Sequence, residues 1–312
     1  MCSSDLPDDM LFAGVELGGT KTILVLAQGT RIVREEILPT GTPETCLNAA
    51  SAVLREWQRD AGFEALGIAS FGPLQLDQSA PDYGHMLATP KKGWGGADIL
   101  GLLSRGLDCP VAIDTDVNGA ALAEAMWGAG AQVAAAEDCL CYITIGTGLG
   151  AGFVVNGKPL HGALHPEAGH IRVRRAAGDD FPGVCPFHGD CIEGLISGPA
   201  LAARFGMPGE QVADDDPRWE HVADALAELL CSILLMTSAR IVLIGGGVGM
   251  TRPALLQLVR RRVVSGLAGY LPFVTTDTIA DIVRAPALGT AAGPLGAIAL
   301  ARASWRSAHR AG

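Results

Sequence analysis

The residues with the clearest chemical signature are four side chains with the spacing of metal ligands. His170 precedes Cys185, His188 and Cys191, and the last three follow the pattern Cys-x-x-His-x-x-Cys. Two thiolates and two imidazoles are typical of a closed, tetrahedral Zn²⁺ site of the structural type, because four protein ligands leave no position for a reacting water. The segment 172–184 carries charges, glycines and a proline, so we expect the metal to hold it folded. The pattern predicts structural zinc.

Carboxylates flank these predicted zinc ligands. Glu167 lies three residues before His170, and Glu193 lies two residues after Cys191. A metal that fixes its own loop would also fix these two side chains. Carboxylate oxygens only accept hydrogen bonds, so a pair of them is suited to the hydroxyl groups of a neutral polyol.

A second acidic segment, Asp-Thr-Asp-Val-Asn at 114–118, lies between a predicted strand and a predicted helix. Polar residues at the carboxyl end of a strand commonly line the active cleft of an α/β protein. Asp116 is therefore a candidate general base. Asn118 is an equally good candidate for the N-cap of the helix that follows. Asp114 lies nearer the strand interior, where we expect a structural role.

Phosphate binding is the chemistry suggested by three glycine-rich clusters, at 18–21, 146–150 and 245–249. The first is not a P-loop, because one residue too many precedes Lys21 and a predicted strand follows where a P-loop needs a helix. The second is not a dinucleotide fingerprint, because its glycine spacing differs and a strand follows it too. Only the third lies between a strand and a helix, where amide groups at a helix N-terminus could meet part of a nucleotide.

The first two clusters occupy equivalent places in an internal repeat. Residues 13–26 resemble residues 141–155, about 130 residues later, and each segment is a strand, a glycine turn with threonine, and a strand. The repeat suggests a duplicated domain with both turns facing a shared cleft, although two unrelated hairpins would give the same pattern. Converging N–H groups, threonine hydroxyls and Lys21 would let two such turns clamp the polyphosphate of ATP.

Alternating strands and helices must position these residues. A helix over 42–61 has Thr42 as its N-cap and Pro43 at its first position, and Gly62 ends it. Helices interleaved with apolar strands indicate an α/β fold. Strands are expected at 12–16, 23–27, 32–38, 65–69, 111–114, 140–145, 151–155 and 241–244. The other helices are expected at 119–127, 217–240, 252–265 and 291–304.

The composition fits a soluble enzyme of two domains, since the chain has 312 residues and 49% of them are hydrophobic. A formal net charge of −10 argues against nucleic-acid binding, which needs a basic face. The apolar runs are too short to span a membrane, and the first ten residues lack the features of a signal peptide. We therefore expect a cytoplasmic protein, in which clustered cysteines bind metal more often than they form disulfides.

In their order along the chain, these motifs resemble those of the ROK sugar kinases, a family within the actin-like or hexokinase-like ATPase superfamily. The resemblance runs from Gly14 to about Gly296. It rests on the zinc ligands and on segments 16–21, 114–124, 145–152, 165–170 and 244–248. A fructokinase-like branch is suggested by segments 89–94, 165–170 and 180–191.

The resemblance implies an α/β fold of the two-lobed actin-like (ribonuclease H-like) ATPase type, with a cleft between duplicated α/β domains. The N-terminal lobe would comprise residues 12–115 and about 295–312, and it would carry the first phosphate turn. The C-terminal lobe would comprise residues 116–294, with the second phosphate turn, the zinc loop and the adenosine turn.

The resemblance also implies a role for individual residues. Asp116 would be the general base for the sugar hydroxyl, and His170 would contact both the sugar and the zinc. The sugar would be surrounded by Thr115, Glu167, His170 and Glu193. The phosphates would be held by Thr20, Lys21, Thr147 and Gly148. The adenosine would be bordered by Pro199, Gly245, Gly246, Gly247, Val248 and Gly249. The structural Zn²⁺ would be held by His170, Cys185, His188 and Cys191.

Two positions depart from the family pattern. Thr115 stands where many glucokinase-type members have asparagine, so one contact to a sugar hydroxyl would differ. Glu16 stands where many members begin the first phosphate motif with aspartate. Its longer carboxylate would reach Mg²⁺ directly or through a water molecule.

We therefore expect an ATP- and Mg²⁺-dependent hexose kinase, first of all a fructokinase that makes fructose 6-phosphate. Glucokinase, mannokinase and N-acyl-hexosamine kinase activities are the enzymatic alternatives. A sugar-responsive regulator is the non-catalytic alternative, although such regulators carry a helix-turn-helix domain before the kinase-like region and about 11 residues precede the first predicted strand here. The expected partner is a small sugar, with no nucleic acid and no membrane, and the family suggests a homodimer.

Overall fold

The computed structural model describes residues 10–131 and 138–310, which fall into two compact α/β units. The described residues of the first unit are 10–131, 157–166 and 290–310. Those of the second unit are 138–156 and 167–289. Within the described ranges, no helix combines the length and the apolar character that crossing a membrane requires.

The first unit is built on a five-stranded sheet with the order β3-β2-β1-β4-β5. Its first three strands are antiparallel neighbours, and the last two run parallel to β1. Mostly buried residues form β1 and β2, whereas β3 at the edge is largely exposed. The strands are β1 (Leu11–Leu17), β2 (Lys21–Gln28), β3 (Arg31–Pro39), β4 (Leu66–Ser70) and β5 (Val111–Thr115).

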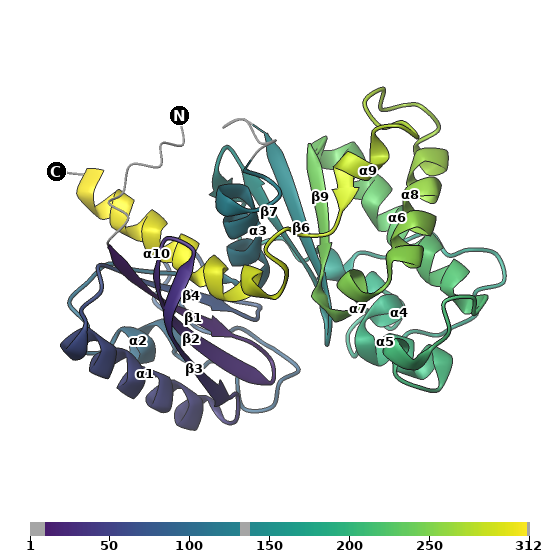
Figure 1. Cartoon of the computed structure of the whole chain (residues 1–312). Coiled ribbons are helices and arrows are strands. Elements are labelled where there is room, and N and C mark those ends of the chain that lie inside the picture. Colours follow the sequence, from purple (N-terminus) through teal and green to yellow (C-terminus); the bar gives the residue numbers. More distant parts are fainter. Residues whose placement is uncertain (1–9, 132–137, 311–312) are drawn as a thin grey trace. The chain divides into compact units, whose positions relative to one another are not determined.

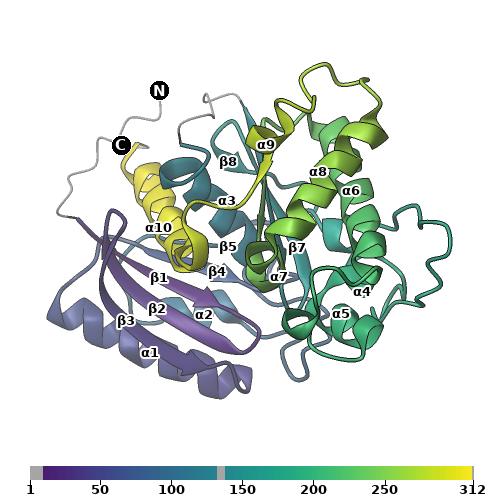
Figure 2. The same cartoon turned by 45° about the vertical axis from the view of Figure 1, so that its right-hand side comes forward.

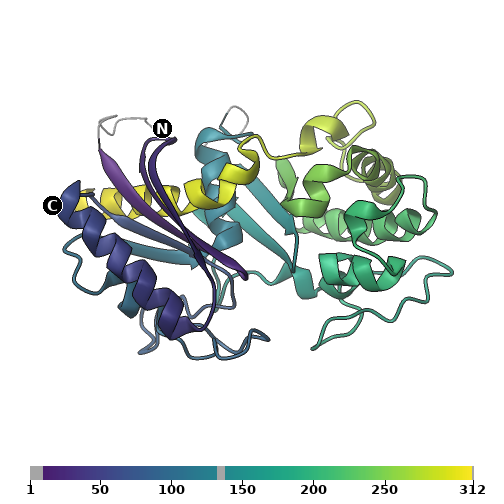
Figure 3. The ribbon, with the colours of Figure 1, turned by 60° about the horizontal axis from the view of Figure 1, so that its bottom comes forward.

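Helices cover both faces of this first sheet (Figure 1). On one face, Leu47 and Leu54 of α1 (Pro43–Asp60) pack with apolar strand residues, as does Leu103 of α2 (Ile99–Ser104). Thr42 caps α1 and Pro43 occupies its first turn, as the sequence predicts. The opposite face is covered by α3 (Asp116–Trp127) and α10 (Ala292–Arg310). Figure 3 shows α1 and α10 on opposite sides of the sheet.

Glycines let α10 approach both α3 and β4 closely. A Cβ atom on Gly296 would overlap the backbone of Gly119, and a Cβ on Gly67 of β4 would overlap the α10 carbonyl of Ala297. This packing keeps α3 with the first unit. The boundary expected after Thr115 therefore differs from the division of the structure, in which residues 116–131 and 157–166 also belong to the first unit.

The second sheet has the order β10-β9-β6-β7-β8. The pair β6 and β7 is antiparallel, like β1 and β2, and β9 runs parallel to β6 as β4 does to β1. The second sheet therefore repeats the strand order of the first, which confirms the predicted duplication. Its strands are β6 (Cys139–Ile145), β7 (Leu149–Val155), β8 (Lys158–Pro159), β9 (Ile241–Gly245) and β10 (Val283–Arg284).

The second unit packs its helices around one apolar core. Leu226 and Leu230 of α6 meet Val259 and Val263 of α8 in this core, and Figure 2 shows the two helices side by side. The shorter helices lie near the ends of the strands and shape the loops there. The helices are α4 (Ile192–Ile196), α5 (Gly198–Phe205), α6 (Arg218–Thr237), α7 (Gly246–Thr251), α8 (Pro253–Leu267) and α9 (Ile279–Ile282).

Candidate active site

One edge of the first sheet gathers the predicted catalytic segments of that unit. Leu17 pairs with Ser70, and Ser70 pairs with Thr115, so the parallel strands β1, β4 and β5 end side by side. Turn one, residues 18–20, follows the first of these strand ends, and Asp116 follows the last. The turn is closed by a hydrogen bond from Gly18 N to Lys21 O at 3.0 Å. The register of the sheet alone brings the phosphate turn and the candidate base to one edge.

Asp116 is the first residue of α3 and is partly buried. Its carboxylate accepts a hydrogen bond from Val117 N at 2.8 Å, and this bond holds the side chain against the backbone at the N-terminus of α3. Burial raises the pKa of Asp116 to about 6, and the backbone hydrogen bond opposes this rise. A carboxylate with a pKa near 6 is ionised at neutral pH yet more basic than an exposed aspartate, which suits a general base.

Glu16 belongs to the same electrostatic cluster. Burial and, to a smaller extent, the negative charge of Asp116 raise the pKa of Glu16 to about 7, although the positive charge of Lys21 opposes the rise. The Glu16 carboxylate also lies at the beginning of α10, where a Cβ on Gly293 would overlap it. The N-terminus of a helix carries partial positive charge that favours a carboxylate. Two acidic groups and a lysine thus lie together beside turn one.

Asp114 is a buried structural anchor, as the sequence predicts. Its Oδ1 accepts hydrogen bonds from Thr115 N at 2.7 Å and from Asn118 Nδ2 at 2.8 Å. Its Oδ2 lies 2.9 Å from His161 Nε2, and this hydrogen bond raises the pKa of His161. Asn118 is not the N-cap of α3, so that expectation is wrong: Thr115 Oγ1 accepts the Asn118 N–H instead, at 3.2 Å. The short threonine side chain reaches this N–H because Thr115 immediately precedes the helix.

Two histidines of this unit were missed by sequence reasoning. His161 binds Asp114, and His165 Nε2 accepts a hydrogen bond from Leu74 N at 3.0 Å. Both lie in the segment 157–166 that returns to the first unit. The sequence assigns no role to His161, and it includes His165 only as the first residue of the motif at 165–170.

In the second unit, turn two (residues 146–150) leads from β6 into β7 and includes the first two residues of β7. Gly198 N, at the start of α5, donates to Gly146 O at 2.7 Å. Glu193 Oε2 accepts the N–H of Leu149 at 3.1 Å, so this predicted sugar ligand lies against the turn. Thr147 at the tip is exposed. Turn two is therefore tied to both α4 and α5.

The third glycine cluster lies beside turn two because β9 and β6 are neighbouring strands. Thr144 pairs with Gly245, and α7 begins at Gly246 as the predicted strand–helix junction requires. Gly246 has φ +77° and packs so closely on Ile145 that a side chain would overlap the backbone there. The structure thus brings together turn two, the Gly245–Gly249 cluster and the α5 start that carries Pro199.

The four predicted metal ligands also meet in the second unit. Their ligand atoms all lie within 4.8 Å of one another. His170 Nδ1 lies 3.8 Å from Cys185 Sγ and 3.6 Å from Cys191 Sγ, and His188 Nδ1 lies 3.9 Å from Cys185 Sγ. A tetrahedral zinc with its usual bond lengths would separate such atoms by about 3.4–3.8 Å. The residues fit Zn²⁺ in both chemistry and spacing.

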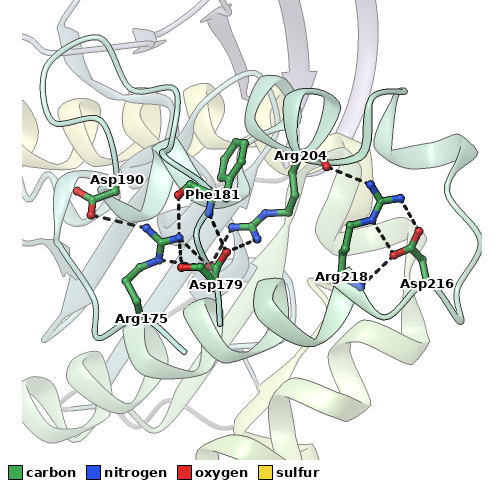
Figure 4. Close-up of polar contacts among 7 residues, drawn as sticks. All are labelled: Arg175, Asp179, Phe181, Asp190, Arg204, Asp216 and Arg218. Carbon is green, nitrogen blue, oxygen red and sulfur yellow. Dashed lines mark hydrogen bonds and ion pairs between the residues drawn. The ribbon is translucent and has the colours of Figure 1, made fainter. Parts of the chain in front are cut away.

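The loop beside this cluster is also held by a buried ion-pair network, which Figure 4 shows. Asp179 pairs with Arg204 of α5 at 2.8 Å and with Arg175 at 2.9 Å, and the Asp179 and Arg204 side chains are each 4% exposed. Arg204 also stacks over Phe181, 4.5 Å from the ring centroid. The expectation that only the metal holds segment 172–184 is therefore wrong. The arginine that matters lies 25 residues away in the sequence, where spacing gives no signal.

Replacing Asp179 by asparagine is expected to destabilise the protein by about 3–5 kcal/mol, because it leaves the buried Arg204 without a counter-charge. Burial alone would raise the pKa of Asp179, but its bonds to Arg204 and Arg175 outweigh burial and lower it to about 2. The stabilisation is therefore complete above about pH 4 and is lost as the pH falls toward 2. Urea unfolding at pH 7 measures the loss. The exposed neighbour Asp180, changed to asparagine, is the control, and equal stability of the two variants would contradict the prediction.

Two α/β units with the same strand order, each with a glycine turn between its first two strands, define a two-lobed fold of the actin-like type. The chain belongs to the ROK family, whose model matches residues 12–304. A fructokinase from Zymomonas mobilis is 39% identical over 303 residues, which cover 95% of this chain and 98% of the relative.

Two solved structures share this fold over nearly the whole chain. A ROK hexokinase from Thermus thermophilus has a TM-score of 0.73 and 27% identity, and the match covers 96% of this chain and 100% of the hexokinase. A ROK glucokinase from Streptomyces griseus, solved with glucose and AMPPNP, has a TM-score of 0.72 and 25% identity. The match covers 94% of this chain and 99% of the glucokinase. These matches confirm the predicted family and fold class.

Proposed function

We propose that the protein transfers the terminal phosphoryl group of ATP to a hydroxyl group of a hexose, with fructose as the preferred sugar. The observation that carries the phosphoryl transfer is the placement of Asp116, with its raised pKa, at the same strand-end edge as the glycine turn 18–20. The choice of fructose is supported by relatives named fructokinase, which are 34–39% identical over most of the chain.

The first unit supplies the base and part of the phosphate site. Thr20 and Lys21 bind phosphate oxygens at turn one, and Asp116 accepts the proton of the sugar hydroxyl as the new bond to phosphorus forms. Glu16 lies beside them and helps to hold Mg²⁺, directly or through water, because carboxylate oxygens are the ligands that Mg²⁺ prefers. Bound Mg²⁺ would neutralise phosphate charge during the transfer.

The second unit supplies the remaining nucleotide and sugar contacts. Thr147 and Gly148 bind phosphate at turn two, where Thr147 is exposed and Gly148 is half-buried. The adenosine lies against Pro199, Gly245, Gly246, Gly247, Val248 and Gly249. The sugar is bound by Thr115, Glu167, His170 and Glu193.

His170, Cys185, His188 and Cys191 hold a structural Zn²⁺, which organises the chain without taking part in the reaction. Support comes from the fit of the four ligand atoms to tetrahedral spacing. The metal would join the short 3₁₀ helix Ala168–His170 to the start of α4, and α4 carries Glu193 to turn two. Through these ligands, a bound Zn²⁺ would help to hold Glu193 in place beside turn two.

A second candidate is a glucokinase, because the Streptomyces griseus structure that this chain resembles was solved with glucose. Mannose and N-acylhexosamines are further candidate substrates. The homodimer and the cytoplasmic location implied by the family resemblance stay predictions, and light scattering of the purified protein measures the first of them.

A coupled assay of ADP release over a panel of hexoses tests the proposed function. With ATP and Mg²⁺, we expect the highest kcat/KM for fructose, lower values for glucose, mannose and N-acetylated hexosamines, and loss of turnover with excess EDTA. A higher kcat/KM for glucose would identify the second candidate instead. Absence of ADP release with every sugar would refute kinase activity and would favour a non-catalytic, sugar-binding role.

A further inference from the structure

A second lysine reaches turn one from a distant part of the chain. Lys91 lies in the long connection between β4 and α2, and its Nζ donates a hydrogen bond to Gly19 O at 2.6 Å across a separation of 72 residues. Gly19 is exposed, and a Cβ placed on it would meet nothing within 4 Å. The ammonium group therefore lies at an open face of the predicted phosphate turn.

An aromatic platform fixes the position of this lysine. Lys91 Nζ lies 5.9 Å from the ring centroid of Phe71 and 6.0 Å from that of Trp94. The two rings pack edge to face with centroids 5.1 Å apart, Trp94 is fully buried, and its Nε1 donates to Gly41 O at 3.0 Å. A long side chain resting on two immobile rings loses less freedom when it binds a ligand.

Phe71 anchors the platform to the strand ends. It follows β4 directly, and its N–H donates to Leu17 O at 2.9 Å, at the point where β1 enters turn one. Lys91, its platform and the turn thus form one rigid assembly at the edge that also carries Asp116.

Among the residues that the structure describes, the charge of Lys91 has no acidic partner at this edge. Lys21 interacts with the carboxylate of Glu16, whereas the hydrogen-bond partner of Lys91 Nζ is a neutral carbonyl. Within residues 10–131 and 138–310, Lys91 forms no ion pair. A lysine has three N–H donors, and Gly19 uses one of them. A fixed ammonium with unused donors, at an exposed glycine turn, is a site for an anion.

We propose that Lys91 is a further catalytic residue, which binds the terminal phosphoryl group of ATP and stabilises its charge during transfer. The inference rests on the proposed function. In the reaction, the bond between the γ-phosphorus and the bridging oxygen of ADP breaks as the sugar oxygen bonds to the same phosphorus, and the hydroxyl proton passes to Asp116. Lys91 neither gains nor loses a proton, and its charge balances the oxygens of the moving group.

A merely structural tie between Lys91 and turn one would behave differently from a phosphoryl ligand. A structural tie would support the turn whichever nucleotide is bound. Its loss would therefore lower the affinities for ADP and ATP alike, and it would lower the melting temperature. A ligand of the terminal phosphoryl group acts only when that group is present. Lys91→Gln separates the two roles, because glutamine keeps an N–H donor for Gly19 but carries no charge.

The test compares Lys91→Gln, Lys91→Met and Lys91→Arg with the control Lys92→Met, which removes an adjacent exposed lysine. The coupled ADP assay gives kcat and KM for sugar and ATP, and calorimetry gives Kd for ADP and for AMPPNP. We expect Lys91→Gln and Lys91→Met to lower kcat by about 10²–10³-fold, the usual effect of removing one transition-state donor. Both should lower the affinity for AMPPNP more than the affinity for ADP. Lys91→Arg should retain most of the activity, and Lys92→Met should match wild type.

The proposal is overturned if Lys91→Gln keeps kcat within about threefold of wild type, or if it lowers the affinities for ADP and AMPPNP equally. If Lys91→Met does not fold, Lys91→Gln alone tests the proposal. If neither neutral variant folds, the comparison of Lys91→Arg with Lys92→Met tests it. A wild-type protein without kinase activity would refute the proposed function instead, and the ratio of AMPPNP to ADP affinity would still test the phosphoryl contact.

Discussion

Replacement of Asp116 by asparagine is expected to lower kcat by about 10²–10⁴-fold, the usual range for loss of a general base. Asparagine keeps the size of the side chain at the start of α3 but cannot accept the proton of the hydroxyl group. Affinity for AMPPNP should stay near that of wild type, because the nucleotide contacts proposed above lie on other residues. Rapid-quench kinetics with fructose measure the chemical step directly, and near-normal kcat would refute Asp116 as the base.

The same variant is expected to be more stable than wild type at pH 8. Burial raises the pKa of folded Asp116 to about 6, compared with about 3.9 in an unfolded chain. A raised pKa adds stability that is complete below about pH 4 and is lost as the pH rises through 6. The neutral amide of the variant does not carry this ionisation cost, so we expect a gain of about 1–2 kcal/mol at pH 8 after allowing for solvent screening.

Urea unfolding without Mg²⁺, at pH 4 and at pH 8, tests whether the variant is the more stable protein at the higher pH. The stability gap between Asp116→Asn and wild type should appear at pH 8 and vanish at pH 4. An equal gap at both values would mean that the effect does not come from ionisation. The raised pKa values of Asp116 and Glu16, about 6 and about 7, also predict that wild-type kcat/KM rises with pH between about 5 and 8, as the two carboxyl groups lose their protons.

Cys185→Ala is expected to release the zinc, lower the melting temperature by about 5–10 °C and lower kcat/KM by at least about 100-fold. The lost ligand frees both the 3₁₀ helix that ends at His170 and the start of α4. Glu193 would then lose its fixed contact with Leu149 N in turn two, and misplacement of a site by about 1 Å can cost 10²-fold in rate. The ion pair of Asp179 with Arg204 stays, so the loop should loosen only in part.

Metal analysis and melting curves test this prediction on wild type, Cys185→Ala and Cys231→Ala. Cys231 lies in α6, outside the metal cluster, and provides the control for loss of a thiol elsewhere in the second unit, although it is less buried than Cys185. Wild type and Cys231→Ala should each contain one zinc per chain. A wild-type protein without zinc, or a Cys185→Ala protein that keeps it, would contradict the assignment.

The parts of the fold that follow local rules could be predicted from the sequence. The two hairpins, the capped helix α1 and the long helix α6 all carry strong periodic or capping signals, and the expected bounds lie within a few residues of the observed ones. The short helices α4, α5 and α7, of five to eight residues, carry too little periodicity to be seen. Helix α3 begins three residues before its expected start, because Thr115 rather than Asn118 provides the cap.

The candidate site also combines features that the sequence predicts with features that it does not. The clustering of the four candidate metal ligands could be predicted from their spacing, and the place of Asp116 at a strand end from the strand that precedes it. The raised pKa of Glu16 and the contact between Lys91 and Gly19 depend on burial and on chain segments that meet only in three dimensions. Sequence spacing does not encode such contacts, so these two features needed the structure.

The close packing of α3 against α10 has a consequence for the order in which the protein can be completed on the ribosome. The five strands of the first sheet are all made by residue 115, yet the helix that covers one face and meets Glu16 begins at residue 292. At about 5–20 residues per second, α10 emerges roughly ten to thirty seconds later. The second unit, continuous apart from residues 157–166, can be finished first. The face of the first sheet that α3 and α10 cover, with Asp116 at the start of α3, is therefore completed only when α10 has been made.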